Sequence, residues 1–123
     1  MTEQSIRART AQAVSQARSI GGRERLNCIA ELDPTALEQA EKLEQQGCAA
    51  AWSFLGIPVL VKDNIDVKGL HTTAGSLALA NHVAASDAPV IRNLRRNGAV
   101  ILGKTNMTEF ANYTTQGMPN GYS

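Results

Sequence analysis

The N-terminal part of the chain has the pattern of an amphipathic helix with a clear end. Residues 2–20 are rich in Ala, Gln and Arg and contain neither Gly nor Pro, so we expect a helix with its N-cap at Thr2. The apolar stripe is thin, which predicts a helix on the surface of a larger body. Gly21 and Gly22 end this pattern. Residues 26–29 are a short apolar segment that we interpret as an edge strand.

Two further helices are predicted by apolar residues spaced three or four positions apart. Asp33 and Pro34 are typical of an N-cap and a first helical position, and the pattern that follows them ends at Gly47. Residues 87–97 predict a third helix, with its arginines facing outward and an Asn-Gly pair at its end. The residues that this helix is expected to bury are Val90, Ile91 and Leu94.

Two apolar runs predict buried strands. Residues 59–62 and 99–102 are apolar on both sides, so we expect them to be neighbours in a mixed sheet that is covered on both faces. Residues 76–80 predict a short helix between them. Asn106 and Glu109 have the spacing of a capping box, which predicts a further helix. Alternating helices and strands indicate an α/β fold.

Composition narrows the class of protein. The chain has 123 residues, of which 43% are hydrophobic and 19% charged, and its formal net charge is +1. This length fits one domain, and the near-neutral charge argues against a nucleic-acid binder, whose binding face is basic. The chain starts with a polar segment, unlike a secretory signal, and no run approaches the roughly 20 apolar residues of a membrane span. We therefore expect a cytoplasmic protein that binds neither nucleic acid nor membrane.

Residues 98–105 match the phosphate-binding pattern GxxxxGK[ST] only formally. Their four middle residues, Ala-Val-Ile-Leu, are strand formers, whereas the phosphate loop is a glycine-rich turn that follows a strand. An arginine-rich helix, rather than a strand, is expected before Gly98. We therefore do not expect nucleotide binding.

Lys62 is the residue whose setting most suggests chemistry. It ends the apolar run 59–62 and precedes Asp63, Asn64 and Asp66, at the carboxyl end of a strand, where α/β proteins gather ligand sites. A lysine enclosed by apolar groups loses stabilisation of its charge, so its pKa falls and the neutral amine can act as a general base. The alternative is a strand-end lysine that reaches solvent.

No metal or cofactor is expected. Asp63 and Asp66 lack a supporting histidine and more often cap turns. His71 and His82 are isolated from other ligand types, so we expect them on the surface or packed. The two cysteines are not in a CxxC pair and are expected to be reduced thiols.

Two blocks of the sequence resemble the amidase signature family. The first is GIPVLVKDNIDVKGLHTTAGS at residues 56–76, and the second extends from DAPV at residue 87 to GAVILGKTNMTEFA, which ends at residue 111. The blocks have the separation usual in that family, and the likeness covers about residue 26 to the end. The final Asn-Gly-Tyr-Ser is more similar to bacterial peptide amidase-like members than to the transamidosome subunit.

The resemblance implies part of an α/β amidase-signature fold, with helices around a mixed β-sheet. Residues 1–25 would be an N-terminal helix and linker, and residues 26–123 the start of the catalytic core. The family hydrolyses carboxamides, here of a small molecule or peptide, with a Ser-cisSer-Lys triad and no cofactor. Its lysine corresponds to Lys62, which as a neutral amine accepts a proton from a middle serine. That serine in turn takes a proton from the nucleophilic serine.

The two serines of this triad have no match in the sequence. In the family they lie in a later segment rich in Gly and Ser, which also supplies the oxyanion hole. Ser76, Ser86 and Ser123 stand in other contexts. We therefore expect the C-terminal remainder of the domain to be absent and the chain alone to be inactive. Residues 110–115 correspond to a wall of the family's substrate channel, and the candidate substrate-binding residues are Ala111, Asn112 and Tyr113.

Two other interpretations stay open. The chain could belong to the glutamine-hydrolysing (A-type) component of a glutamyl- or aspartyl-tRNA amidotransferase, which shares the lysine chemistry but needs partner proteins and ATP. It could also be a non-catalytic product, either truncated or a small interaction module. A homo-oligomer is compatible with each of these.

Overall fold

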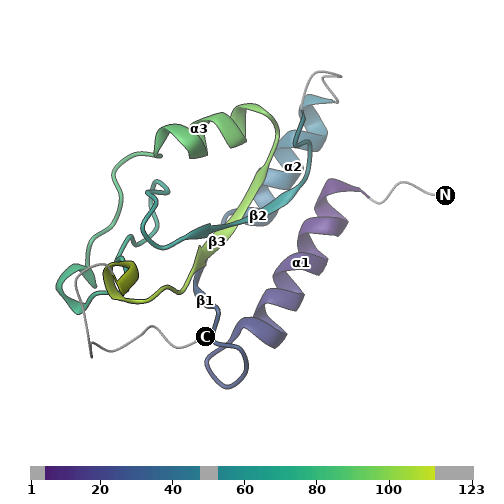
Figure 1. The fold of residues 1–123 in the computed structure, drawn as a ribbon. Helices are drawn as coiled ribbons and strands as arrows, with labels where there is room; N and C mark the ends of the chain where they lie inside the picture. The colour runs from purple at the N-terminus through teal and green to yellow at the C-terminus, as the bar shows by residue number, and fades with distance from the viewer. Residues whose placement is uncertain (1–4, 48–52, 113–123) are drawn as a thin grey trace.

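A mixed three-stranded sheet is the centre of the molecule. The computed structural model describes residues 5–47 and 53–112. Figure 1 shows the elements, which are α1 (Ile6–Gly21), β1 (Ile29–Leu32), α2 (Ala36–Gln46), β2 (Pro58–Lys62), η1 (Leu77–Leu79), α3 (Pro89–Arg96), β3 (Val100–Thr105) and η2 (Glu109–Asn112). The strand order is β1-β3-β2, with β3 antiparallel to β1 and parallel to β2. The expected pairing of the two apolar strands in a mixed α/β sheet is confirmed.

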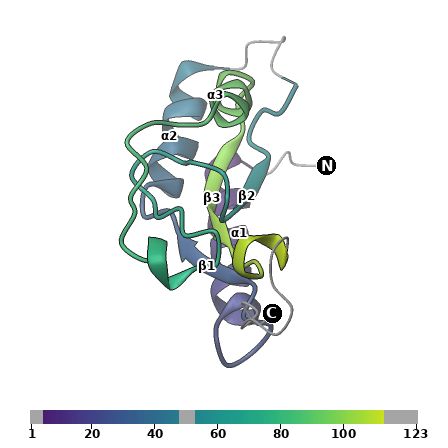
Figure 2. The ribbon, with the colours of Figure 1, turned by 60° about the vertical axis from the view of Figure 1, so that its left-hand side comes forward.

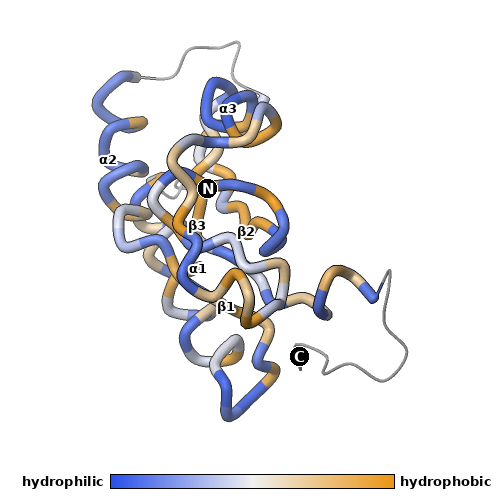
Figure 3. Tube along the Cα trace, turned by 90° about the vertical axis from the view of Figure 1, so that its left-hand side faces the viewer, coloured by the Kyte–Doolittle hydropathy of each residue, from blue (hydrophilic) through white to orange (hydrophobic). Residues whose placement is uncertain are grey.

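Helices and connections cover both faces of the sheet. On one face, Ala36 and Ala40 of α2 pack with Val100 and Leu102 of β3, and residues of α1 join them. On the other face, Ile91 of α3 packs in a cluster whose other buried members are Val61, Val67, Leu70 and Ile101. Figure 3 shows hydrophobic residues along β2 and β3, whereas most residues of α2 are hydrophilic. The central strand therefore contributes to two separate cores.

A bulge at Gly103 changes which side of β3 its residues face. Val59 pairs with Ile101, but the next residue of β2, Leu60, pairs with Gly103. Ile101 and Lys104 consequently lie on the same face, although strict alternation would place them on opposite faces. The position requires glycine, because its φ is +152° and a Cβ would lie 2.2 Å from the carbonyl oxygen of Glu31.

The side chain of Gln39 in α2 hydrogen-bonds the backbone of Ile101 in β3, a residue that β1 does not reach. Its Nε2 donates to the carbonyl oxygen of Ile101 at 3.2 Å, and its Oε1 accepts from the amide of Ile101 at 3.0 Å. The same Oε1 accepts from Nη1 of Arg95 in α3 at 2.7 Å. One side-chain amide thus connects both helices to the central strand.

The N-termini of the helices differ from the expected positions. α1 begins at Ile6 with Ser5 as its N-cap, whose hydroxyl accepts from the amide of Ala8. α2 begins at Ala36 rather than Pro34, because Asp33 forms a turn in which its carboxylate accepts from the amide and hydroxyl of Thr35. The predicted end of α2 at Gly47 is confirmed.

α3 is shorter than residues 87–97 and buries fewer side chains than expected. It starts at Pro89, while Asp87 accepts hydrogen bonds from the amide of Lys68 and from Arg95. Ile91 is buried as predicted, but Val90 is 50% exposed and Leu94 is only partly buried. The prediction that Val90 faces the core is therefore wrong. Asn97 and Gly98 end the helix as expected.

The shorter elements agree with the sequence pattern only in part. The edge strand β1 covers residues 29–32 rather than 26–29, and the short helix near residues 76–80 is confirmed as η1. Asn106 does not cap a helix, because its side-chain amide donates to the carbonyl oxygen of Asn27. Residues 109–112 form a turn, η2, in which Phe110 and Ala111 have positive φ. This turn follows the carboxyl end of β3 (Figures 1 and 2).

None of the helices in residues 5–47 and 53–112 is long and apolar enough to span a bilayer.

Candidate functional site

Lys62 is the last residue of β2 and its side chain is exposed. It pairs with Thr105, the last residue of the parallel strand β3, so the carboxyl ends of both strands lie at the same edge of the sheet. The apolar enclosure expected around Lys62 is not formed by the described residues. Within them, Lys62 instead fits the alternative of a strand-end lysine that reaches solvent.

The enclosed lysine is Lys104, which sequence patterns indicate only as part of the formal phosphate-loop match. It is 0% exposed, and its Nζ donates to the carbonyl oxygen of His71 at 2.8 Å, to Oγ1 of Thr72 at 3.2 Å and to Oδ1 of Asp63 at 3.4 Å. Burial lowers the pKa of Lys104, while the Asp63 carboxylate acts in the opposite direction. The sequence signal that could have indicated this burial is Gly103, because a glycine within an apolar strand often marks a bulge.

Asp63 lies directly after Lys62 but in the opposite environment, because it is only 3% exposed. Besides Lys104, its carboxylate accepts from the amide and hydroxyl of Thr73, and its carbonyl oxygen accepts from the amide of Ala74 at 3.1 Å. Asp63 therefore holds a turn, which is the more common role of such a residue. Within the described ranges no three His, Cys, Asp or Glu residues gather as a metal site would require.

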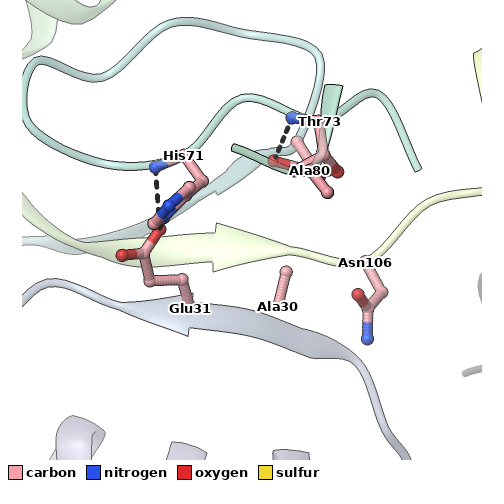
Figure 4. A pocket seen from close by; sticks show the side chains of 7 residues that line it. Ala30, Glu31, His71, Thr73, Ala80 and Asn106 are labelled. Atoms are coloured by element: carbon pink, nitrogen blue, oxygen red, sulfur yellow. Dashed lines mark hydrogen bonds and ion pairs between the residues drawn. The ribbon is translucent and has the colours of Figure 1, made fainter. Parts of the chain in front are cut away.

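A polar pocket of about 380 Å³ lies beside this turn. Figure 4 shows His71 and Glu31 pointing toward each other in it, and the Glu31 carboxylate accepts from the His71 amide at 2.8 Å and lies 3.1 Å from Nδ1. The residues that line the pocket are Ala30, Glu31, Asp63, His71, Thr73, Ala80 and Asn106. Lys62 is not among them, so the strand-end lysine does not contribute to this pocket.

Ala111 and Asn112, two of the three candidate substrate-binding residues, lie in η2, which follows the carboxyl end of β3, the sheet edge at which Lys62 also ends β2. Ala111 and Asn112 are exposed in η2, and both have positive φ. The amide of Phe110 donates to the carbonyl oxygen of Ala74 at 2.9 Å, which fastens η2 to the loop that the Asp63 turn holds. Tyr113 lies outside the described residues, as do the final residues used to distinguish peptide amidases.

Of the three serines considered above, the structure describes Ser76 and Ser86. Ser76 is buried and accepts from the amide of Ala78 at the start of η1. Ser86 is exposed, and Ser123 lies outside the described residues. The segment that matches the phosphate-loop pattern forms β3, as its strand-forming residues predict.

Comparisons with known proteins identify relatives along nearly the whole chain. The family model "Amidase" matches residues 11–122. A protein of Arabidopsis thaliana named a probable amidase is 43% identical over 103 residues, which is 80% of this chain and 20% of that protein. The A-type component of the glutamyl-tRNA(Gln) amidotransferase of Lactiplantibacillus plantarum is 53% identical over 76 residues, which is 62% of this chain and 16% of that protein.

A solved structure agrees in fold as well. The native peptide amidase of Stenotrophomonas maltophilia is 38% identical, with a TM-score of 0.78 over 89% of this chain and 23% of that one. The chain thus spans about a fifth of the length of the proteins it matches. Both the family match and the shared fold lead to one conclusion, that the chain belongs to the amidase family.

Proposed function

We propose that this chain is the N-terminal part of an enzyme that hydrolyses a carboxamide C–N bond by a Ser-cisSer-Lys mechanism, with Lys62 as the base. The observation that carries the proposal is the place of Lys62, at the carboxyl end of β2 beside the parallel β3. Ligand sites of α/β proteins gather at this edge. The side chain is exposed there, so it can meet groups supplied by the rest of a longer chain.

In this proposal residues 26–123 begin the catalytic core, and both serines come from a segment beyond residue 123. The middle serine would take the proton of the nucleophilic serine and give its own proton to Lys62. The nucleophile attacks the amide carbon, the C–N bond breaks and ammonia or an amine leaves. Water then releases the acid from the acyl-enzyme. Ala111, Asn112 and Tyr113 would contact the substrate, and no cofactor takes part.

The test uses the complete gene product that contains this chain. Ammonia release from a set of small and peptide carboxamides is measured for the wild type, Lys62→Ala and Lys68→Ala. Lys68 is an exposed lysine on the same connection and is a matched control. We expect Lys62→Ala to lose at least about 100-fold in kcat, as for a missing general base, and Lys68→Ala to lose nothing. Unchanged turnover in Lys62→Ala would exclude the assigned role.

A second candidate is the glutamine-hydrolysing component of a tRNA-dependent amidotransferase. It is favoured by the 53% identity over 76 residues to the Lactiplantibacillus plantarum protein. The same lysine chemistry would then act on glutamine within a complex. Copurification of partner proteins and glutamine-dependent amidation of charged tRNA would support it. Hydrolysis of free carboxamides by the isolated protein favours the first candidate.

We further propose that the protein acts in the cytoplasm, binds neither nucleic acid nor membrane, and can form a homo-oligomer. Size-exclusion chromatography with light scattering of the complete gene product tests the last point.

A further inference from the structure

Lys62 and Asp63 are consecutive residues in opposite environments. The side chain of Lys62 is exposed, whereas Asp63 is 3% exposed and turned into the molecule. Backbone hydrogen bonds hold this corner at both residues. The carbonyl oxygen of Lys62 accepts from the amide of Ile65 at 3.0 Å, and that of Asp63 accepts from the amide of Ala74 at 3.1 Å. These two bonds fix the backbone from which the Lys62 side chain leaves the sheet.

Lys104 is the group that holds this turn from inside. Its ammonium has three protons and three acceptors, which belong to His71, Thr72 and Asp63. His71 and Thr72 lie on the loop that passes beside the turn, and Asp63 is part of the turn. Since Lys104 sits in the central strand, this network fastens both segments to the most deeply buried part of the sheet.

Stability alone does not account for such an arrangement. A buried ion pair costs desolvation of both charges, and apolar residues of similar volume are often equally stable or more so. The directional contacts of an ammonium can instead fix one geometry where an apolar side chain would allow several. The geometry fixed here is that of the residue directly before Asp63.

We propose that Lys104 is a positioning residue for Lys62, acting through the Asp63 carboxylate to fix the strand-end geometry from which the Lys62 amine projects. This inference rests on the role proposed for Lys62, which Lys104 does not touch. It adds a second lysine to the site, one that accepts no proton during the reaction.

The variants for the test are made in the complete gene product. Lys104→Met and Asp63→Ala break the network from its two ends, and Thr73→Ala weakens it more mildly if either of these fails to fold. Asp63→Asn is the conservative variant, because its amide oxygen can still accept from Lys104 and from the Thr73 amide. Ile91→Ala is the matched control, since it disturbs the same face of the sheet without touching the network.

Two readouts are compared, each corrected for the folded fraction. The first is kcat and KM for amide hydrolysis. The second is the rate at which an amine-acylating reagent modifies Lys62 relative to Lys68 in the same molecule, measured by peptide mass spectrometry. The second readout does not depend on catalysis, so it decides this inference even if the protein hydrolyses no amide and the proposed function fails.

We expect Lys104→Met, Asp63→Ala and Thr73→Ala to lower kcat, the first two by about tenfold or more, with KM nearly unchanged. The Lys62 to Lys68 modification ratio should change in the same variants, and Asp63→Asn should restore both values toward wild type. The Ile91→Ala control should affect stability only. Wild-type ratios in Lys104→Met and Asp63→Ala, or an equal change in Ile91→Ala, would overturn the proposal.

Discussion

Asp63 and Lys104 meet in the interior, 41 positions apart in the chain, with 3.4 Å between a carboxylate oxygen and the ammonium nitrogen. Their side chains are 5% and 0% exposed. A charge pair at this depth persists only because each partner has further hydrogen bonds, from Thr73 on one side and to His71 and Thr72 on the other.

Removing one partner of this pair should be far more harmful than removing both charges. Lys104→Met leaves the Asp63 carboxylate buried without its counter-ion, and we expect a loss of about 3–5 kcal/mol in the free energy of unfolding. The double variant Lys104→Met with Asp63→Asn should lose much less, since no charge remains buried. Urea denaturation of the complete gene product measures both. Additive losses in the double variant would contradict the pairing.

The contribution of Lys104 to stability should rise with pH. Burial lowers the pKa of Lys104 from its ordinary value of 10.5, so between these two values the unfolded chain binds more protons than the folded one. The free energy of unfolding then increases with pH through that window. We expect the stability difference between wild type and Lys104→Met to grow as pH rises toward about 10. A flat or shrinking difference in urea denaturation would contradict this.

Gly103→Ala should destabilise the sheet by about 2–4 kcal/mol. The new methyl group would lie 2.2 Å from the carbonyl oxygen of Glu31, and the backbone of β1 cannot withdraw without breaking its ladder. Gly22→Ala is the control, because its nearest neighbour would be 3.5 Å away and its φ is −68°. Thermal unfolding followed by circular dichroism distinguishes the two, and equal midpoints would refute the steric argument.

Gln39→Ala should cost about 2–3 kcal/mol, because it leaves the amide and carbonyl of Ile101 without their side-chain partner. Exposed Gln46 on the same helix offers a control, for which we expect almost no change. Hydrogen exchange adds a local check, since the Ile101 amide should exchange faster in Gln39→Ala. Continued protection of that amide would show that Gln39 is not its essential partner.

Thr10→Val should stabilise the protein by about 1 kcal/mol. The Thr10 hydroxyl is buried and is the one buried side-chain polar atom in the described part of the chain without a hydrogen-bond partner. Valine has nearly the same shape and removes that cost. Thr10→Ser, which keeps the hydroxyl and loses a methyl group, should destabilise. A lower unfolding midpoint for Thr10→Val would mean that the hydroxyl is satisfied.

The sequence predicts the elements better than the site. Apolar spacing identifies α2, α3, β2 and β3, because each buries a face and burial imposes periodicity. The turn-capping role of Asp63 is expected from its residue type, but its buried ion pair with Lys104 escapes prediction for a physical reason. Lys104 and Asp63 are charged, so their residue types predict exposure to solvent, and only contacts between distant segments can show that they neutralise each other inside.

Predicted boundaries are wrong where side chains compete with the expected cap. Asp33 has the chemistry of an N-cap, but its carboxylate binds Thr35 and Gln39 and the helix begins later. Asn106 also has the chemistry of an N-cap, but its side-chain amide donates to the carbonyl oxygen of Asn27. In both cases a residue with the right chemistry has a different partner.

The extra residue in β3 has a consequence for how this strand can change. Side chains alternate between the two faces of the sheet along β3, and this alternation is shifted by one residue at Gly103. A regular strand of the same length, without the bulge, would turn Lys104 toward α1 and α2, away from its three acceptors, whereas deleting Gly103 together with the bulge would keep Lys104 on the face of Ile101. The bulge, rather than the residue type, therefore decides that Lys104 is kept inside.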